Sequence, residues 1–117
     1  MKNYNLFLDD VRMPMGVHLY DSKPIYKDNK DWVIVRNYND FINCIIDNGL
    51  PNIVSFDHDL GDFDQYGNEK TGYDCVKWLV DYCIDNNLGF PDYMIHSMNT
   101  VGDTNMVSYI ENFKKRY

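Results

Sequence analysis

The sequence has few cysteines, and it has no long apolar run. The three cysteines, Cys44, Cys75 and Cys83, lie in apolar helical patterns without the CxxC or Cys/His spacing of a redox pair or a zinc site. We therefore expect reduced thiols packed in the core of a cytoplasmic protein, or one of the host cytoplasm if the chain is viral. No segment approaches the roughly 18 apolar residues of a membrane span, and the first ten residues turn acidic too early for a signal peptide. The sequence predicts no membrane partner.

Positive charge is also scarce, with 11 basic against 18 acidic residues and a net charge of −7. Such a surface repels a phosphate backbone, so we expect no binding of long nucleic acid through a basic surface. A small phosphorylated ligand held by a few local cations is compatible with this charge. The abundance of Asn, Asp, Tyr and Ile is typical of an AT-rich coding sequence, and a phage origin is one interpretation of it.

The 117 residues are enough for one sizeable core and too few for two ordinary domains, so we expect a single domain over residues 1–117. Apolar periodicity predicts a helix capped by Asn39 and stopped at Gly49, a helix opened by a capping box of Thr71 and Asp74, and a last helix from about Asp103. Segments 11–31 and 62–70 lack a sustained pattern and are expected to be loops. Short apolar runs predict strands at residues 5–8, 32–36, 52–56 and 93–95.

Strands that alternate with amphipathic helices predict an α/β fold with a parallel, doubly wound sheet covered by helices on both faces. Right-handed crossovers bring the carboxyl ends of all the strands to one edge, where ligands bind. Polar groups follow every expected strand at this edge. They are Asp9 and Asp10, Arg36, Asp57 to Asp59, and His96, Ser97 and Asn99.

The acids at this edge predict a cation site. Asp9, Asp10 and Asp57 supply the hard oxygen ligands that Mg²⁺ prefers, with Asp59 as an alternative to Asp57. The competing interpretation is that these residues only form turns, because Asp is common in loops after strands. Two acidic clusters on neighbouring strands favour a function, since packed like charges disfavour ionisation unless a cation retains them.

The histidines predict acid–base chemistry. His58 and His96 follow neighbouring strands, and two imidazoles facing one pocket can serve as general base and general acid. We expect Asp57 and Asp59 to orient them as part of the catalytic group. Alternatively, a histidine here is a buried spacer that bonds a backbone carbonyl.

The phosphate ligands are predicted to be Arg12 and Arg36, because a guanidinium holds a phosphate through two parallel N–H bonds. Ser97 and Asn99 would add a hydroxyl and an amide donor near the start of the last helix. A salt bridge from Arg12 to Asp9 or Asp10 is a competing role.

These residues resemble the receiver domains of two-component signalling, in the places taken by Asp9, Asp10, Asp57 and Ser97. The chain departs from them in lacking a fifth strand with its lysine and the first helix, and in pairing histidines. A closer resemblance is to the cyclic-phosphate-processing receiver domains, which it covers almost end to end. The motifs concerned are "LFLDDVRMP", "WVIVRNYNDF", "VSFDHDLG", "TGYDCVKWL" and "YMIHSMNTVGDTNM".

The resemblance implies a receiver-like or flavodoxin-like sheet of about four strands in the order 2-1-3-4. It also implies phosphoesterase-type processing of a cyclic phosphate on a nucleotide or an RNA end. Two alternatives stay open: a non-catalytic module that sequesters a cyclic nucleotide, for example in viral counter-defence, and a receiver-like interaction domain.

Overall fold

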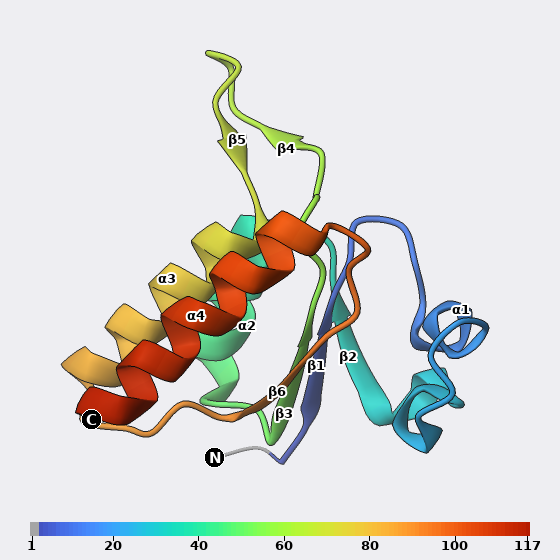
Figure 1. The fold of residues 1–117 in the computed structure, drawn as a ribbon, viewed down its shortest axis with the longest axis horizontal. Helices are drawn as coiled ribbons and strands as arrows, with labels where there is room; N and C mark the ends of the chain where they lie inside the picture. Colours follow the sequence, from blue (N-terminus) through green and yellow to red (C-terminus); the bar gives the residue numbers. More distant parts are fainter. Residues whose placement is uncertain (1–2) are drawn as a thin grey trace.

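The computed structural model describes residues 3–117, and its central feature is a parallel sheet of four strands. The spatial order is β2-β1-β3-β6, which confirms the predicted order of the first, second, third and last strands of the core sheet (Figure 1). The strands are β1 (Asn5–Leu8), β2 (Trp32–Val35), β3 (Ile53–Phe56) and β6 (Asp92–Ile95).

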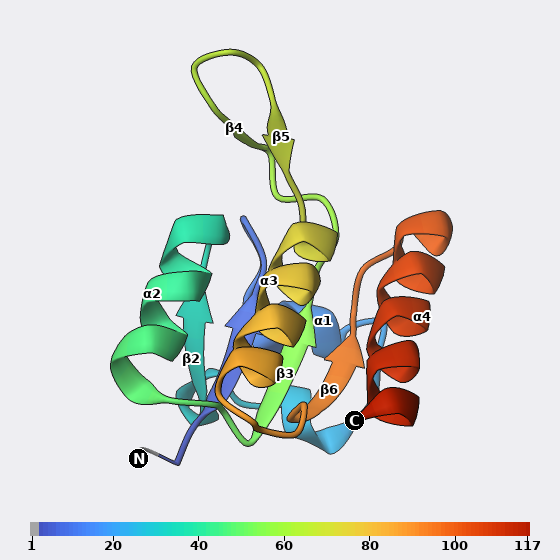
Figure 2. The same cartoon turned by 90° about the vertical axis from the view of Figure 1, so that its left-hand side faces the viewer.

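The helices cover both faces of the sheet, as predicted. The chain runs from β1 to β2 in one direction and from β2 to β3 in the other, so right-handed connections place the intervening segments on opposite faces. Figure 2 shows three long helices in front of the sheet and the short α1 behind it. The long helices are α2 (Tyr38–Asn48), α3 (Gly72–Asp85) and α4 (Thr100–Arg116).

The sheet separates two apolar cores because successive strand side chains point to opposite faces. Leu6 and Leu8 pack with the three long helices in the larger core. Phe7 points the other way and packs with Val17, Tyr26 and Trp32 in the smaller one. The smaller core exists because the segment after β1 folds back over that face.

The segment 11–31 was predicted to be a loop, and this was wrong in part. It contains α1 (Pro14–His18) and two short 3-10 turns, Pro24–Tyr26 and Asn29–Asp31. Pro14 begins α1, where its fixed φ suits the first helical turn. One turn and a half is too short to show a helical period in the sequence.

Two predicted helix starts were also displaced. The cap of α2 is Asn37 rather than Asn39, because Asn37 accepts from the Asp40 amide while Asp62 accepts from the Tyr38 amide. The second of these contacts joins residues 24 apart in sequence, so local pattern could not reveal it. Helix α4 begins at Thr100 rather than near Asp103, capped by Asn99. The predicted capping box of Thr71 and Asp74 on α3 is confirmed.

The predicted loop 62–70 is a small antiparallel hairpin of β4 (Asp62–Phe63) and β5 (Glu69–Lys70) that projects beyond the carboxyl edge (Figure 1). Its turn is closed by Asp64, whose carboxylate accepts from the Tyr66 and Asn68 amides. None of the helices within residues 3–117 combines the length and the apolar character that crossing a membrane requires.

Candidate functional site

The carboxyl ends of β1, β3 and β6 surround a hollow of about 350 Å³, which we call the acidic hollow. Six of the residues predicted to form the site line it, and Met98 is the seventh lining residue. They are Asp10, Arg12, Asp57, Asp59, Ser97 and Asn99. Asp9, His58, His96 and Arg36 lie around it, and each is engaged in contacts of its own.

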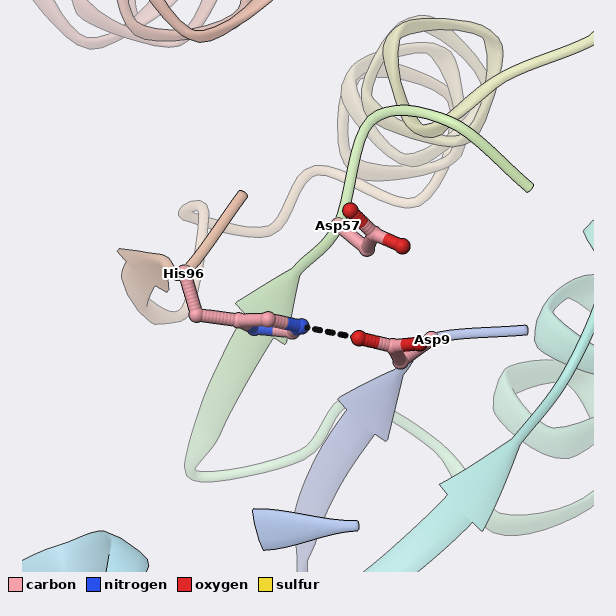
Figure 3. Close-up of side chains that lie close together, drawn as sticks. All are labelled: Asp9, Asp57 and His96. Carbon is pink, nitrogen blue, oxygen red and sulfur yellow. Dashed lines mark hydrogen bonds and ion pairs between the residues drawn. The ribbon is translucent and has the colours of Figure 1, made fainter. Parts of the chain in front are cut away.

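Asp9 is buried beneath the hollow and takes part in three hydrogen bonds. Its Oδ1 accepts from the backbone amides of Val11 and Arg12 at 3.0 and 2.8 Å, and its Oδ2 lies 3.0 Å from Nε2 of His96 (Figure 3). Burial acts to raise the pKa of Asp9, but His96 and the two amides outweigh it and lower the pKa to about 2. Asp9 is therefore a fixed negative charge.

His96 is buried as well, and both of its ring nitrogens have partners. Nδ1 lies 2.7 Å from the Ser55 hydroxyl, which lies 2.6 Å from the Tyr26 hydroxyl. The imidazole stacks on Phe7, with ring centroids 4.5 Å apart. When Nε2 carries the proton, Tyr26 donates to Ser55, Ser55 to His96 and His96 to Asp9, so every member has its partner. We call this chain, Tyr26–Ser55–His96–Asp9, the buried network.

Asp57 lies beside this network and differs sharply from Asp9. One oxygen from each of Asp9 and Asp57 and a ring nitrogen of His96 lie within 4.8 Å of one another, and Figure 3 shows Asp57 facing the other two. Burial and the charge of Asp9 raise the pKa of Asp57 to about 7, although its Oδ1 accepts from the His58 amide. Burial and the same charge also raise the pKa of Asp10. Asp57 can thus gain or lose a proton near neutral pH.

His58 belongs to a separate group from His96. Its Nδ1 lies 2.9 Å from Oδ1 of Asp59, and the Asn99 amide donates to the same carboxylate at 3.2 Å. The ring rests on Gly102 in the first turn of α4, where a Cβ atom would clash with it. Because Asp59 accepts at Nδ1, it favours the tautomer in which Nε2 carries no proton.

The two arginines have different surroundings. Arg12 lines the acidic hollow, with NH1 donating to the Tyr20 hydroxyl at 2.8 Å and lying 3.8 Å from Asp9. Arg36 does not line it. Its guanidinium instead donates to the backbone carbonyls of Asp9 and Arg12 at 3.0 and 2.6 Å. Arg36 thereby braces the loop that carries Arg12.

Ser97 and Asn99 enclose the hollow from the β6 side, and both also serve the start of α4. The side-chain oxygen of Asn99 caps the helix by accepting from the backbone amide of Gly102 at 2.9 Å. The Ser97 hydroxyl accepts from the backbone amide of Asn99 at 3.0 Å. Their polar atoms are partly committed to this turn. Gly102, in the first turn of α4, makes room for the His58 ring.

Sequence reasoning missed several residues of this region. Tyr20, Tyr26 and Ser55 support site residues, but the tyrosines lie in the segment that showed no pattern and Ser55 lies inside an apolar strand. Asp103 has a buried Oδ1 with no hydrogen-bond partner among the described residues, and burial raises its pKa. Its position directly after Gly102 in "TVGD" was the available signal. Gly72 was also missed: its Cα packs so closely on the Asp57 carbonyl that a side chain would not fit.

The strand order β2-β1-β3-β6, with acids after β1 and β3, defines a receiver-like α/β domain. The family model described as the cyclic-phosphate processing receiver domain matches residues 4–112, and the chain belongs to this family. The suspected resemblance is thereby confirmed. Comparisons with curated proteins and with solved structures found no match.

Proposed function

We propose that this chain is a phosphoesterase that processes a cyclic phosphate carried by a nucleotide or an RNA end. The observation that carries the proposal is that Arg12 and Asp57 line the same hollow in a chain of this family. A guanidinium binds phosphate through charge-assisted hydrogen bonds. A carboxyl whose pKa is about 7 is suited to proton transfer near neutral pH.

In the proposed reaction a water oxygen bonds to phosphorus and one ester P–O bond of the ring breaks. The water gives up a proton and the departing oxygen takes one. We assign the first transfer to Nε2 of His58, held by Asp59, and the second to the protonated Asp57. His96 has no ring nitrogen left for the substrate, because both are already bonded. Its contribution is to hold Asp9 in place. Arg12, Ser97 and Asn99 hold the phosphate, and Arg36 contributes by fixing Arg12.

Mg²⁺ fits the same hollow. Three carboxyl groups face one guanidinium there, with Asp9 beneath, and burial together with the charge of Asp9 raises the pKa values of Asp57 and Asp10. Asp10, Asp57 and the remaining lone pair of Asp9 are hard oxygen ligands of the kind that Mg²⁺ prefers. Asp57 would be ionised with a cation bound there, so its role as proton donor applies to the site without the ion. The cation would instead polarise a phosphoryl oxygen. Millimolar Mg²⁺ should then raise the melting temperature, and Asp10→Asn should abolish that rise. No rise in the wild type would remove the ion from the proposal.

The decisive experiment is a turnover assay on 2′,3′- and 3′,5′-cyclic nucleotides and on RNA with a cyclic-phosphate end, with and without chelator. The wild type should convert at least one of them, and Asp57→Asn should lower kcat/KM by roughly 10²–10⁴-fold, the usual contribution of a general acid or base. Asp81→Asn, at an exposed position of α3, is the matched control and should match the wild type. A wild type that converts none of the panel would refute the phosphoesterase proposal.

A binding module that sequesters a cyclic nucleotide is the second candidate. It is favoured by the burial of His96, which leaves the hollow with one imidazole beside it instead of two. In this case ligand raises the melting temperature without being converted, because binding to the native state alone is enough to stabilise it. A domain that only contacts other proteins would show neither effect with these ligands.

A further inference from the structure

A second hollow, of about 360 Å³, adjoins the acidic hollow. Both have Ser97 and Met98 in their linings, so this segment forms a common wall between them. Each hollow lies near the lower end of the range of about 300–1,000 Å³ that is typical of small-molecule sites. The second hollow is lined by Tyr20, Asp21, Ser22, Ile95, His96, Ser97 and Met98.

The chemistry of the second hollow differs from that of the first. Tyr20 and Met98 are large apolar side chains with 47% and 72% of their surface exposed, so both can present apolar surface to a ligand. Asp21 is paired with Lys23 at 2.9 Å, so these two charges offset each other. The Ser22 hydroxyl adds a polar group at the edge. Such a lining suits a flat, neutral ring with hydrogen-bonding edges better than a second phosphate.

The two hollows are also joined by a hydrogen-bonded bridge. The Tyr20 hydroxyl accepts from Arg12 and donates to the His96 carbonyl at 3.0 Å, so the aromatic ring is fixed relative to the guanidinium. The Arg12 guanidinium carbon also lies 5.6 Å from the centre of the Tyr20 ring. If Arg12 binds a phosphate that is attached to a sugar, a further group on that sugar would therefore lie close to Tyr20 and Met98.

We propose that the second hollow is a nucleobase subsite, in which the base of a cyclic-phosphate nucleotide or RNA end packs between Tyr20 and Met98. The inference rests on the proposed function, which supplies the phosphate site, and it narrows the class of substrate. The enzyme recognises a nucleoside cyclic phosphate and not a cyclic phosphate in general.

The test compares a 2′,3′-cyclic nucleotide with the cyclic phosphate of 1-O-methylribose, which has no base. Base stacking on aromatic side chains predicts that the wild type favours the nucleotide by roughly 10- to 100-fold in kcat/KM. Met98→Ala should bring this ratio down towards one. Met15→Ala, which removes an exposed methionine of α1 that lines neither hollow, should keep the wild-type ratio.

A second measurement separates this inference from the proposed function. The methyl resonance of Met98 should shift when the parent nucleoside, which lacks phosphate, is added at millimolar concentration. Equal turnover of the two substrates, or an unmoved Met98 methyl, would overturn the subsite and leave the phosphoesterase standing. A shifted methyl without any turnover would support the subsite and refute the catalysis.

Discussion

The two histidines that sequence reasoning treated as a pair occupy opposite environments. His96 is buried in the network with Asp9, where both of its nitrogens are bonded and its ring stacks on Phe7. His58 is partly buried between Asp59 and Gly102, with 15% of its side chain exposed. Each imidazole has a carboxylate partner at 2.9 or 3.0 Å. Burial, and not the identity of the partner, distinguishes them.

The two aspartates of the site, Asp9 and Asp57, are both buried and differ in their partners. Burial acts to raise both pKa values, but Asp9 accepts hydrogen bonds from two backbone amides and an imidazole, and its pKa falls to about 2. Asp57 accepts from one amide, and burial together with the charge of Asp9 raises its pKa to about 7. A carboxyl that is always ionised can fix a structure, and one that titrates near neutral pH can transfer protons. We therefore propose that the buried network supports the site and that the Asp57–His58–Asp59 segment carries the proton transfers.

Removing the partly buried imidazole of His58 tests this division most strongly. His58→Ala should lower kcat/KM by roughly 10²–10⁴-fold, because a general base is lost, and should lower the melting temperature less than His96→Ala does. The measurement is turnover of the preferred cyclic phosphate beside a thermal melt. His18→Ala, on α1, is the matched control and should retain full turnover. A His58→Ala enzyme with normal kcat/KM would end the catalytic assignment.

His96→Ala should have the opposite profile. It opens a cavity against Phe7 and deprives Asp9 and Ser55 of their partner, so we expect the free energy of unfolding to fall by about 2–5 kcal/mol. Denaturant titration measures this loss. His96→Gln should recover part of it, because its amide can donate to Asp9 as Nε2 does. If His96→Ala remained fully stable and yet lost turnover, the two histidines would be a catalytic pair after all.

Sequence pattern was sufficient for the sheet because each strand is a short apolar run, and the acids after β1 and β3 showed where the site would lie. It could not separate His58 from His96, since both follow a strand and both are near acids. What separates them is the smaller core, built by Tyr26 and Val17 from a segment without any pattern. Arg36 was expected to bind phosphate because it also stands at the end of a strand at this edge. The fold instead brings its guanidinium to the backbone carbonyls of Asp9 and Arg12, which are distant in sequence.

The packing of the His58 ring on Gly102 gives a test with a smaller expected effect. Gly102→Ala adds a methyl group where the imidazole lies, so the ring must move while α4 gains a better helix former. A displacement of about 1 Å can cost up to roughly 10²-fold in rate, and we expect a loss of this size without loss of stability. Gly16→Ala in α1, where a Cβ would meet nothing within 4 Å, is the control. Equal turnover in both variants would show that the position of His58 does not matter.

The pH dependence of stability offers the finest comparison between Asp9 and Asp57. The native pKa of Asp57 is raised from 3.8 to about 7, so its contribution to the free energy of unfolding is complete below pH 3.8 and is lost as the pH rises through 7. Asp9, whose pKa is lowered to about 2, contributes stability above pH 3.8 that is lost as the pH falls towards 2. Asp57→Asn removes only the first effect. Its melting temperature should exceed that of the wild type at pH 8 by several degrees, at about 4–8 °C per kcal/mol for a small domain, and the gap should close towards pH 4. A gap that stays constant from pH 4 to 8 would mean that Asp57 is ionised throughout, and the assignment of Asp57 as the proton donor would fail with it.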